Sequence, residues 1–85
     1  MKAYVLIRVS EKGSHTVRKF LAEDCREKVK DAHVLLGGDQ DVIAELEVDD
    51  YHDLDDVLFN RIQGHHLVDS TSTYVVSPRF ENKSK

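Results

Sequence analysis

The chain has 85 residues, of which 40% are hydrophobic and 33% are charged, with a formal net charge of −4. These values suit one small globular domain and exclude an intrinsically disordered chain. The net negative charge argues against nucleic acid as a direct partner, because phosphate contacts need a concentrated cationic surface. The single cysteine, Cys25, excludes an intrachain disulfide, so we expect a small core residue in a cytoplasmic protein.

The first predicted element is a strand over residues 3–9. Its odd-numbered residues form one apolar face, and Tyr4 and Leu6 make most of the other face apolar as well. A sheet that is buried on one side only alternates more cleanly than this. We therefore expect the second face of this strand to pack against another apolar surface. Because the strand follows Met1 and Lys2 directly, and because no apolar run is long enough to span a bilayer, we expect neither a signal peptide nor a membrane span.

A helix is predicted next, with Ser14 as its N-cap and its end near residues 26–28. Its apolar face follows the spacing i, i+3, i+4 and i+8, through Val17, Phe20, Leu21 and Cys25. Residues 29–36 form the second predicted strand and residues 41–48 the third. The short connection over residues 37–40 makes these two strands an antiparallel hairpin.

The second predicted helix begins after Asp50, which acts as its N-cap, and Gly64 ends it. We expect its buried stripe to consist of Tyr51, Leu54, Val57, Leu58, Arg61 and Ile62. The fourth predicted strand covers residues 68–76 and is ended by Pro78. A single domain over residues 1–78 and a polar C-terminal tail over residues 79–85 follow from this division.

The element order is therefore βαββαβ. With right-handed crossovers it predicts an α+β, ferredoxin-like fold, in which a four-stranded antiparallel sheet carries both helices on one face. The other sheet face is left bare, although it includes Tyr4, Leu6 and Ile43. The least costly cover for so small a domain is a second copy, so we predict a homodimer through the open face.

The hairpin connection combines two glycines, Gly37 and Gly38, with two carboxylates, Asp39 and Asp41. The glycines allow positive φ and close approach of the backbone. If the third strand already begins at Asp39, the two carboxylates point to the same side. They could then bind a small polar ligand, or they could simply end a hairpin. Glycine and aspartate are ordinary turn residues, which favours the second interpretation.

Two stretches carry a resemblance to a known family. Residues 32–44 hold an apolar strand, Gly38, Asp39 and Asp41, and a second apolar strand, and residues 70–76 match a typical last strand at Thr71, Thr73, Tyr74, Val75 and Val76. Over residues 2–76 the chain resembles the effector-binding domain of the Lrp/AsnC (feast/famine) transcriptional regulators. That family usually has Gly-Asp-Tyr-Asp in the hairpin, and here Gln40 replaces the aromatic residue.

The resemblance implies a domain that dimerises by packing sheets, whose dimers assemble into rings with amino acids bound between dimers near the glycine loop. The ligand-binding candidates that it implies are Gly38, Asp39, Gln40, Asp41, Thr71 and Thr73. A helix-turn-helix has no room before Ala3, so we expect a stand-alone effector domain. It would act on transcription through full-length Lrp/AsnC relatives. We expect no cofactor.

Other interpretations stay open. His52 and Asp56 have a spacing that can chelate a metal, and His65 and His66 are adjacent, but closed metal sites usually show three or four converging ligands. A solvated acidic helix face and a polar loop explain the same residues, and we predict no metal site.

An enzyme would need a nucleophile or an acid/base pair in a cleft. The chain has no nucleophile-elbow, phosphate-loop or zincin motif, and Cys25 belongs to an apolar stripe. Small ferredoxin-like dimers include monooxygenases and haem-handling proteins, for which His33 or His65 could serve. A third class, amino-acid-binding modules of the ACT type, shares the element order but fits the hairpin less well. We predict that the chain is not an enzyme.

Overall fold

The structure is a computed structural model that describes residues 1–78, so the polar tail predicted at residues 79–85 lies outside the described part. The elements in chain order are β1 (Lys2–Val9), α1 (Ser14–Asp24), β2 (Val29–Val34), β3 (Val42–Glu47), α2 (Tyr51–Asp55), η1 (Asp56–Ile62) and β4 (Val68–Val75). The segment η1 is a π-helix that continues α2 directly. The observed order is the predicted βαββαβ.

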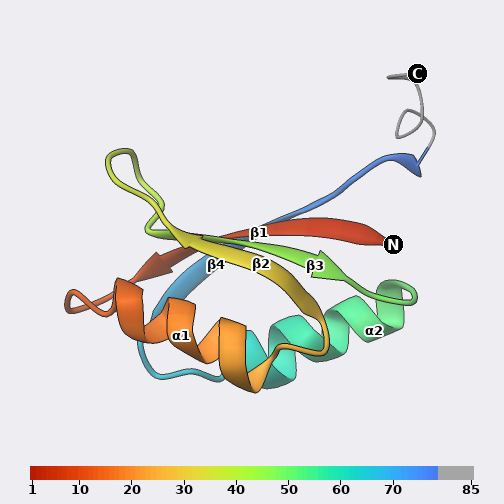
Figure 1. The fold of residues 1–85 in the computed structure, drawn as a ribbon, viewed down its shortest axis with the longest axis horizontal. Helices are drawn as coiled ribbons and strands as arrows, with labels where there is room; N and C mark the ends of the chain where they lie inside the picture. Colours follow the sequence, from red (N-terminus) through yellow and green to blue (C-terminus); the bar gives the residue numbers. More distant parts are fainter. Residues whose placement is uncertain (79–85) are drawn as a thin grey trace.

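The four strands form one sheet in the order β2-β3-β1-β4, and each neighbouring pair is antiparallel. Both helices lie against the same face of this sheet, and the other face is left open (Figure 1). The predicted ferredoxin-like α+β fold is thereby confirmed. The register places Ile7 of β1 between Val42 of β3 and Thr71 of β4, so these three residues form one row across the sheet.

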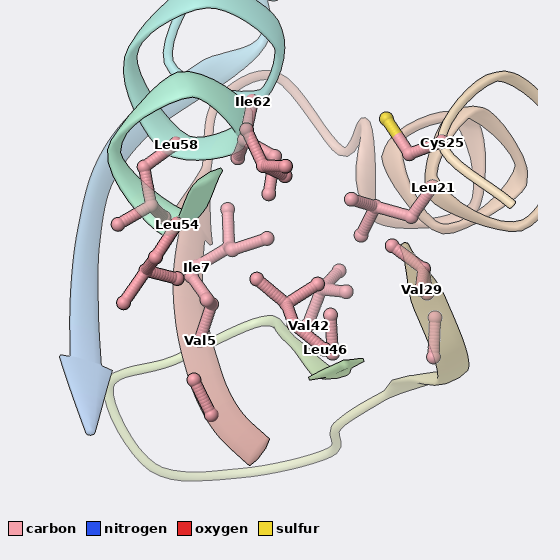
Figure 2. Packing of buried hydrophobic residues seen from close by; sticks show 14 of the residues in the cluster. Val5, Ile7, Leu21, Cys25, Val29, Val42, Leu46, Leu54, Leu58 and Ile62 are labelled. Carbon is pink, nitrogen blue, oxygen red and sulfur yellow. The ribbon is translucent and has the colours of Figure 1, made fainter. Parts of the chain in front are cut away.

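The core lies between the sheet and the helices. Alternate residues of the two central strands, among them Val5, Ile7 and Leu46, are fully buried against Leu21 and Ile62 from the helices (Figure 2). Burying one such side chain contributes about 1.5–3 kcal/mol to folding. This period-two burial orients the strands, because it forces the odd-numbered residues of β1 toward the helices and the even-numbered residues away from them.

The boundaries of α1 differ from the prediction at both ends. Gly13 takes the N-cap position without a side-chain hydrogen bond, and Ser14 is the first helical residue. The tight turn before the helix decides this, because the Gly13 N–H donates to the Ser10 carbonyl at 3.1 Å and the Val17 N–H donates to Gly13. The helix ends at Asp24, and a turn follows in which the N–H groups of Lys28 and Val29 both donate to the Cys25 carbonyl.

The second helix confirms its predicted N-cap, because Asp50 Oδ1 accepts a hydrogen bond from the Asp53 N–H at 2.8 Å. The predicted burial of Tyr51 is wrong, as 67% of this residue is exposed. It occupies the first turn, at the border of the helix layer, and only Leu54 of α2 reaches the core. The π-helical continuation was not predicted. It brings Val57, Leu58 and Ile62 into the core, while Arg61 stays half-buried.

Three strands are shorter than predicted. β2 ends at Val34, and β3 begins at Val42, because the backbone between them leaves the sheet as a loop. β3 ends at Glu47, and β4 ends at Val75. Within residues 1–78, no helix is long and apolar enough to cross a membrane.

Candidate functional site

The loop over residues 35–41, here called the glycine loop, joins β2 to β3 and rises on the sheet side opposite the helices (Figure 1). Gly37 and Gly38 have φ angles of 85° and 72°, in the left-handed region that favours glycine. A Cβ at either position would have no atom within 4 Å, so the backbone conformation, not space, requires glycine. Leu36 beside them is 96% exposed.

The base of the glycine loop is fixed by three hydrogen bonds that all involve Asp41. Its carbonyl accepts from the Leu35 N–H at 2.8 Å, and its own N–H donates to the Ile7 carbonyl at 2.9 Å. Its carboxylate oxygen Oδ2 accepts from the Val9 N–H at 2.8 Å. Asp41 therefore serves first to hold the loop on β1. The third strand begins after it, so the condition under which Asp39 and Asp41 would share a strand face is not met.

Arg8, at the end of β1, lies beside the tip of the same loop. Its Nε donates to the backbone carbonyl of Asp39 at 3.2 Å, and both residues are exposed. The carboxylate of Asp39 forms no hydrogen bond or ion pair with any other residue of the described part. Sequence reasoning did not single out Arg8. The available signal was a cation that follows Tyr4 and Leu6 on the second face of the predicted strand.

The two threonines lie elsewhere. Thr71 is opposite Ile7 and Thr73 is opposite Val5 in the β1–β4 register. Residues that face each other across antiparallel strands share a side of the sheet, so both threonines lie on the helix side. Accordingly, Thr71 Oγ1 accepts a hydrogen bond from Gln63 Nε2 at 2.9 Å, just after η1. The structure thus unites Gly38, Asp39, Gln40 and Asp41 in one loop and places Thr71 and Thr73 across the sheet from it.

The histidines, Asp56 and Cys25, which were considered as metal ligands or as a nucleophile, make contacts within the fold. His65 Nδ1 accepts from the Leu67 N–H at 3.1 Å, and its ring stacks on His66 at 4.9 Å between centroids. Asp56 accepts from Asn60 Nδ2 at 2.6 Å. Within residues 1–78, no three His, Cys, Asp or Glu side chains are grouped as metal ligands. Cys25 is fully buried, and desolvation by this burial raises the pKa of its thiol.

The fold, with a glycine loop fixed at the end of the central strands, agrees with a family comparison. The model of the Lrp/AsnC ligand binding domain matches residues 2–84, nearly the whole chain. The chain belongs to the Lrp/AsnC ligand-binding domain family. No curated protein matches it significantly.

Solved structures of Lrp/AsnC proteins share the fold. FFRP-DM1 is 26% identical, with a TM-score of 0.81, and the match covers 89% of this chain and 97% of that one. AsnC of E. coli is 21% identical with a TM-score of 0.78, over 88% of this chain and 49% of AsnC. The transcriptional regulator NMB0573 of Neisseria meningitidis, solved as a complex with L-Met, is 17% identical with a TM-score of 0.69, over 91% of this chain and 50% of that one.

A similar fold also occurs in an enzyme. The dehydrochlorinase TftG of Burkholderia phenoliruptrix has a TM-score of 0.55 and 9% identity, over 91% of this chain and 94% of that one. A likeness at this identity shows the fold alone. The Lrp/AsnC match, in contrast, is to a ligand-binding domain.

Proposed function

We propose that the chain is an amino-acid effector-binding and oligomerisation module of the Lrp/AsnC type. It binds its effector at the glycine loop and assembles with further copies through the open sheet face. It modulates transcription in the cytoplasm by assembling with Lrp/AsnC regulators that bind DNA. The family match and the L-Met complex of the Neisseria regulator support this function.

The fixed base of the glycine loop is the observation that carries the proposal. Asp41 holds two backbone groups of β1, while Gly38 and Asp39 at the tip stay exposed. A loop that is rigid at its base and open at its tip can present backbone N–H groups and carboxylates to a small polar ligand. The left-handed glycines let such a ligand approach the backbone closely.

The open sheet face supports the assembly. Tyr74 of β4 is 60% exposed and lies opposite Tyr4 of β1, and Leu6 lies between Ile43 and Ser72. The glycine loop, in which Leu36 is exposed, rises on this same side of the sheet, opposite the helices (Figure 1). A second copy that packs on the open face removes this apolar surface from water, which favours association.

A non-enzymatic role agrees with the surroundings of the one thiol. Thiolates, not thiols, act as nucleophiles, and an apolar burial that raises the pKa keeps Cys25 protonated at neutral pH. The buried Cys25 is therefore poorly placed for covalent catalysis.

The proposal is tested by a thermal-shift screen of the twenty common amino acids, combined with the mass by light scattering. A ligand at 100 times its dissociation constant stabilises the folded state by about 2.7 kcal/mol, which raises the melting temperature measurably. We expect one or a few amino acids to do so and a mass of at least a dimer. No shift with any of the twenty would contradict effector binding, and a monomer mass would contradict the assembly.

A further inference from the structure

Arg8 and Asp39 form a pair of opposite charges that do not neutralise each other. The Nε of Arg8 donates to the backbone carbonyl of Asp39, and so uses one of its five N–H donors. Within residues 1–78, neither Arg8 nor Asp39 forms an ion pair with another side chain. The guanidinium of Arg8 is thus held against the backbone of Asp39, whose own side chain is exposed and unpaired within the described residues.

We propose that Arg8 binds the carboxylate of the amino-acid effector and that the carboxylate of Asp39 binds its ammonium group. This assignment rests on the proposed function and names the residues that recognise the two charges. Arginine presents N–H donors in a planar fork that matches a carboxylate, and the two Nη atoms remain for such a bidentate contact after Nε has bonded to the loop. An α-amino acid carries one charge of each sign, and Arg8 and Asp39 offer one charge of each sign in two residues that are joined by a hydrogen bond.

The register of the sheet separates the two threonine candidates, Thr71 and Thr73, from Arg8. Thr71 and Thr73 lie on the helix side of β4, whereas Arg8 lies opposite Ser70, on the side from which the glycine loop rises. Asp41 is also committed, because its Oδ2 accepts from the Val9 N–H. Asp39 at the tip of the loop and Arg8 beside it therefore remain as the charged candidates.

A simpler role for Arg8 is to tether the loop through the Asp39 carbonyl. The two roles differ in one measurable quantity, the preference for an amino acid over its primary amide, which lacks the carboxylate charge. Loss of a tether weakens the binding of both compounds alike. Loss of a carboxylate partner weakens the binding of the acid only.

The experiment uses calorimetric titration with each amino acid that shifts the melting temperature and with its primary amide, for example L-methionine and L-methioninamide. The variants are Arg8→Gln, Arg8→Lys and, as a matched control at the other end of β1, Lys2→Gln. Lys2 is a cation of the same strand whose Nζ lies 3.7 Å from Glu45. Circular dichroism shows that each variant is folded.

We expect the wild type and Lys2→Gln to bind the acid at least tenfold more tightly than the amide, the effect of a charge-assisted bond. Arg8→Gln should abolish this preference, and Arg8→Lys should keep part of it, because lysine retains the charge without the fork. If Arg8→Gln binds and keeps the preference, Arg8 does not bind the carboxylate, although the proposed function stands. If the wild type binds no amino acid, both the proposed function and this assignment are wrong.

Discussion

The carboxylate of Asp41 lies 2.8 Å from the backbone nitrogen of Val9 and accepts its hydrogen bond. The contact extends the β1–β3 pairing beyond its last register pair, Ile7 and Val42, with a side-chain oxygen in place of a carbonyl. A residue that sequence reasoning placed in a binding site is therefore also a structural clamp. The two roles can be separated by substitution.

Replacing Asp41 with alanine leaves the partly buried Val9 N–H without its acceptor. We expect a loss of about 1 kcal/mol in the free energy of unfolding, which is the usual effect of one hydrogen bond. Asp41→Asn retains an acceptor oxygen and should lose less. Asp39→Ala is the control, because the Asp39 side chain has no hydrogen bond within residues 1–78. Urea denaturation measures all three, and equal stability of Asp41→Ala and the wild type would show that the clamp does not stabilise the fold.

The two loop glycines should tolerate alanine poorly for conformational reasons alone. Gly37→Ala and Gly38→Ala place a Cβ in open space but in a left-handed backbone, at a cost of about 1 kcal/mol each. Gly38→Asn should cost less, since asparagine tolerates this region. Gly64→Ala is the control, because its Cβ would approach no atom closer than 3.4 Å. Melting temperatures rank the four variants, and a Gly64→Ala loss as large as that of Gly38→Ala would contradict this explanation.

Acid should weaken the contact between α2 and the start of β2. Lys28 Nζ lies 2.8 Å from Asp53 Oδ2. This hydrogen bond is the main reason why the pKa of Asp53 lies below the usual value of 3.8, and a hydrogen bond from the Asp49 N–H is the second. A group whose pKa is lowered by folding stabilises the folded state at pH values above its ordinary pKa. This stabilisation is lost as the pH falls through the folded-state pKa. Asp53→Asn should therefore have a lower free energy of unfolding than the wild type at neutral pH. Below pH 3.8 this free energy should decline less steeply than that of the wild type.

The matched control for this acid dependence is Asp55→Asn. Its carboxylate has no hydrogen bond or ion pair among the described residues, so the decline in acid should match that of the wild type. Stability is measured by urea denaturation at several pH values between 2 and 7. Parallel curves for the wild type and Asp53→Asn would show that the Lys28 contact does not contribute.

The open sheet face should hold the assembly together. We expect sedimentation at micromolar concentration to show at least a dimer, and Tyr74→Glu to weaken it at least tenfold, because burying an unpaired charge is costly. Tyr51→Glu is a control of similar exposure, at 67% against 60% for Tyr74, on the helix side of the molecule. A monomeric wild type, or equal effects of both substitutions, would contradict the predicted interface.

The purified chain should not bind duplex DNA by itself. Its net charge is −4, and the acidic side chains outnumber the lysines and arginines by 16 to 12. Phosphate contacts by cations give nonspecific DNA binding its strength and its salt dependence. Fluorescence anisotropy with labelled duplex at two salt concentrations checks this, and tight binding that weakens steeply with salt would refute it.

The sequence predicted the fold because the deciding signals are local. Alternation in β1 and the Asp50 cap depend only on neighbouring residues, and both are confirmed. The resemblance in residues 32–44 and 70–76 led to the correct family. The failures concern features set by distant contacts. The cap of α1 depends on the preceding turn, in which Glu11 and Lys12 both have positive φ, and Ser14 could not reveal it.

The candidate site was only partly predictable for the same reason. The glycine loop is contiguous in sequence, so Gly38 to Asp41 could be grouped directly. Which side Thr71 and Thr73 face depends on their register with β1, which the pattern of β4 alone does not reveal, since most of its residues are polar. Arg8 comes close to Asp39 only when β1 and the loop meet, and 31 residues separate them in the chain.

The π-helix gives the chain a place that can absorb a change in length. In it the Gln63 N–H donates to the Leu58 carbonyl five residues earlier, instead of four as in an α-helix. The buried Val57 and Ile62 are likewise five residues apart, while the exposed Asn60 lies between them. Removing Asn60 would leave the two buried residues at α-helical spacing. The wide turn therefore has the form of a one-residue insertion that the helix accommodated without giving up its core contacts.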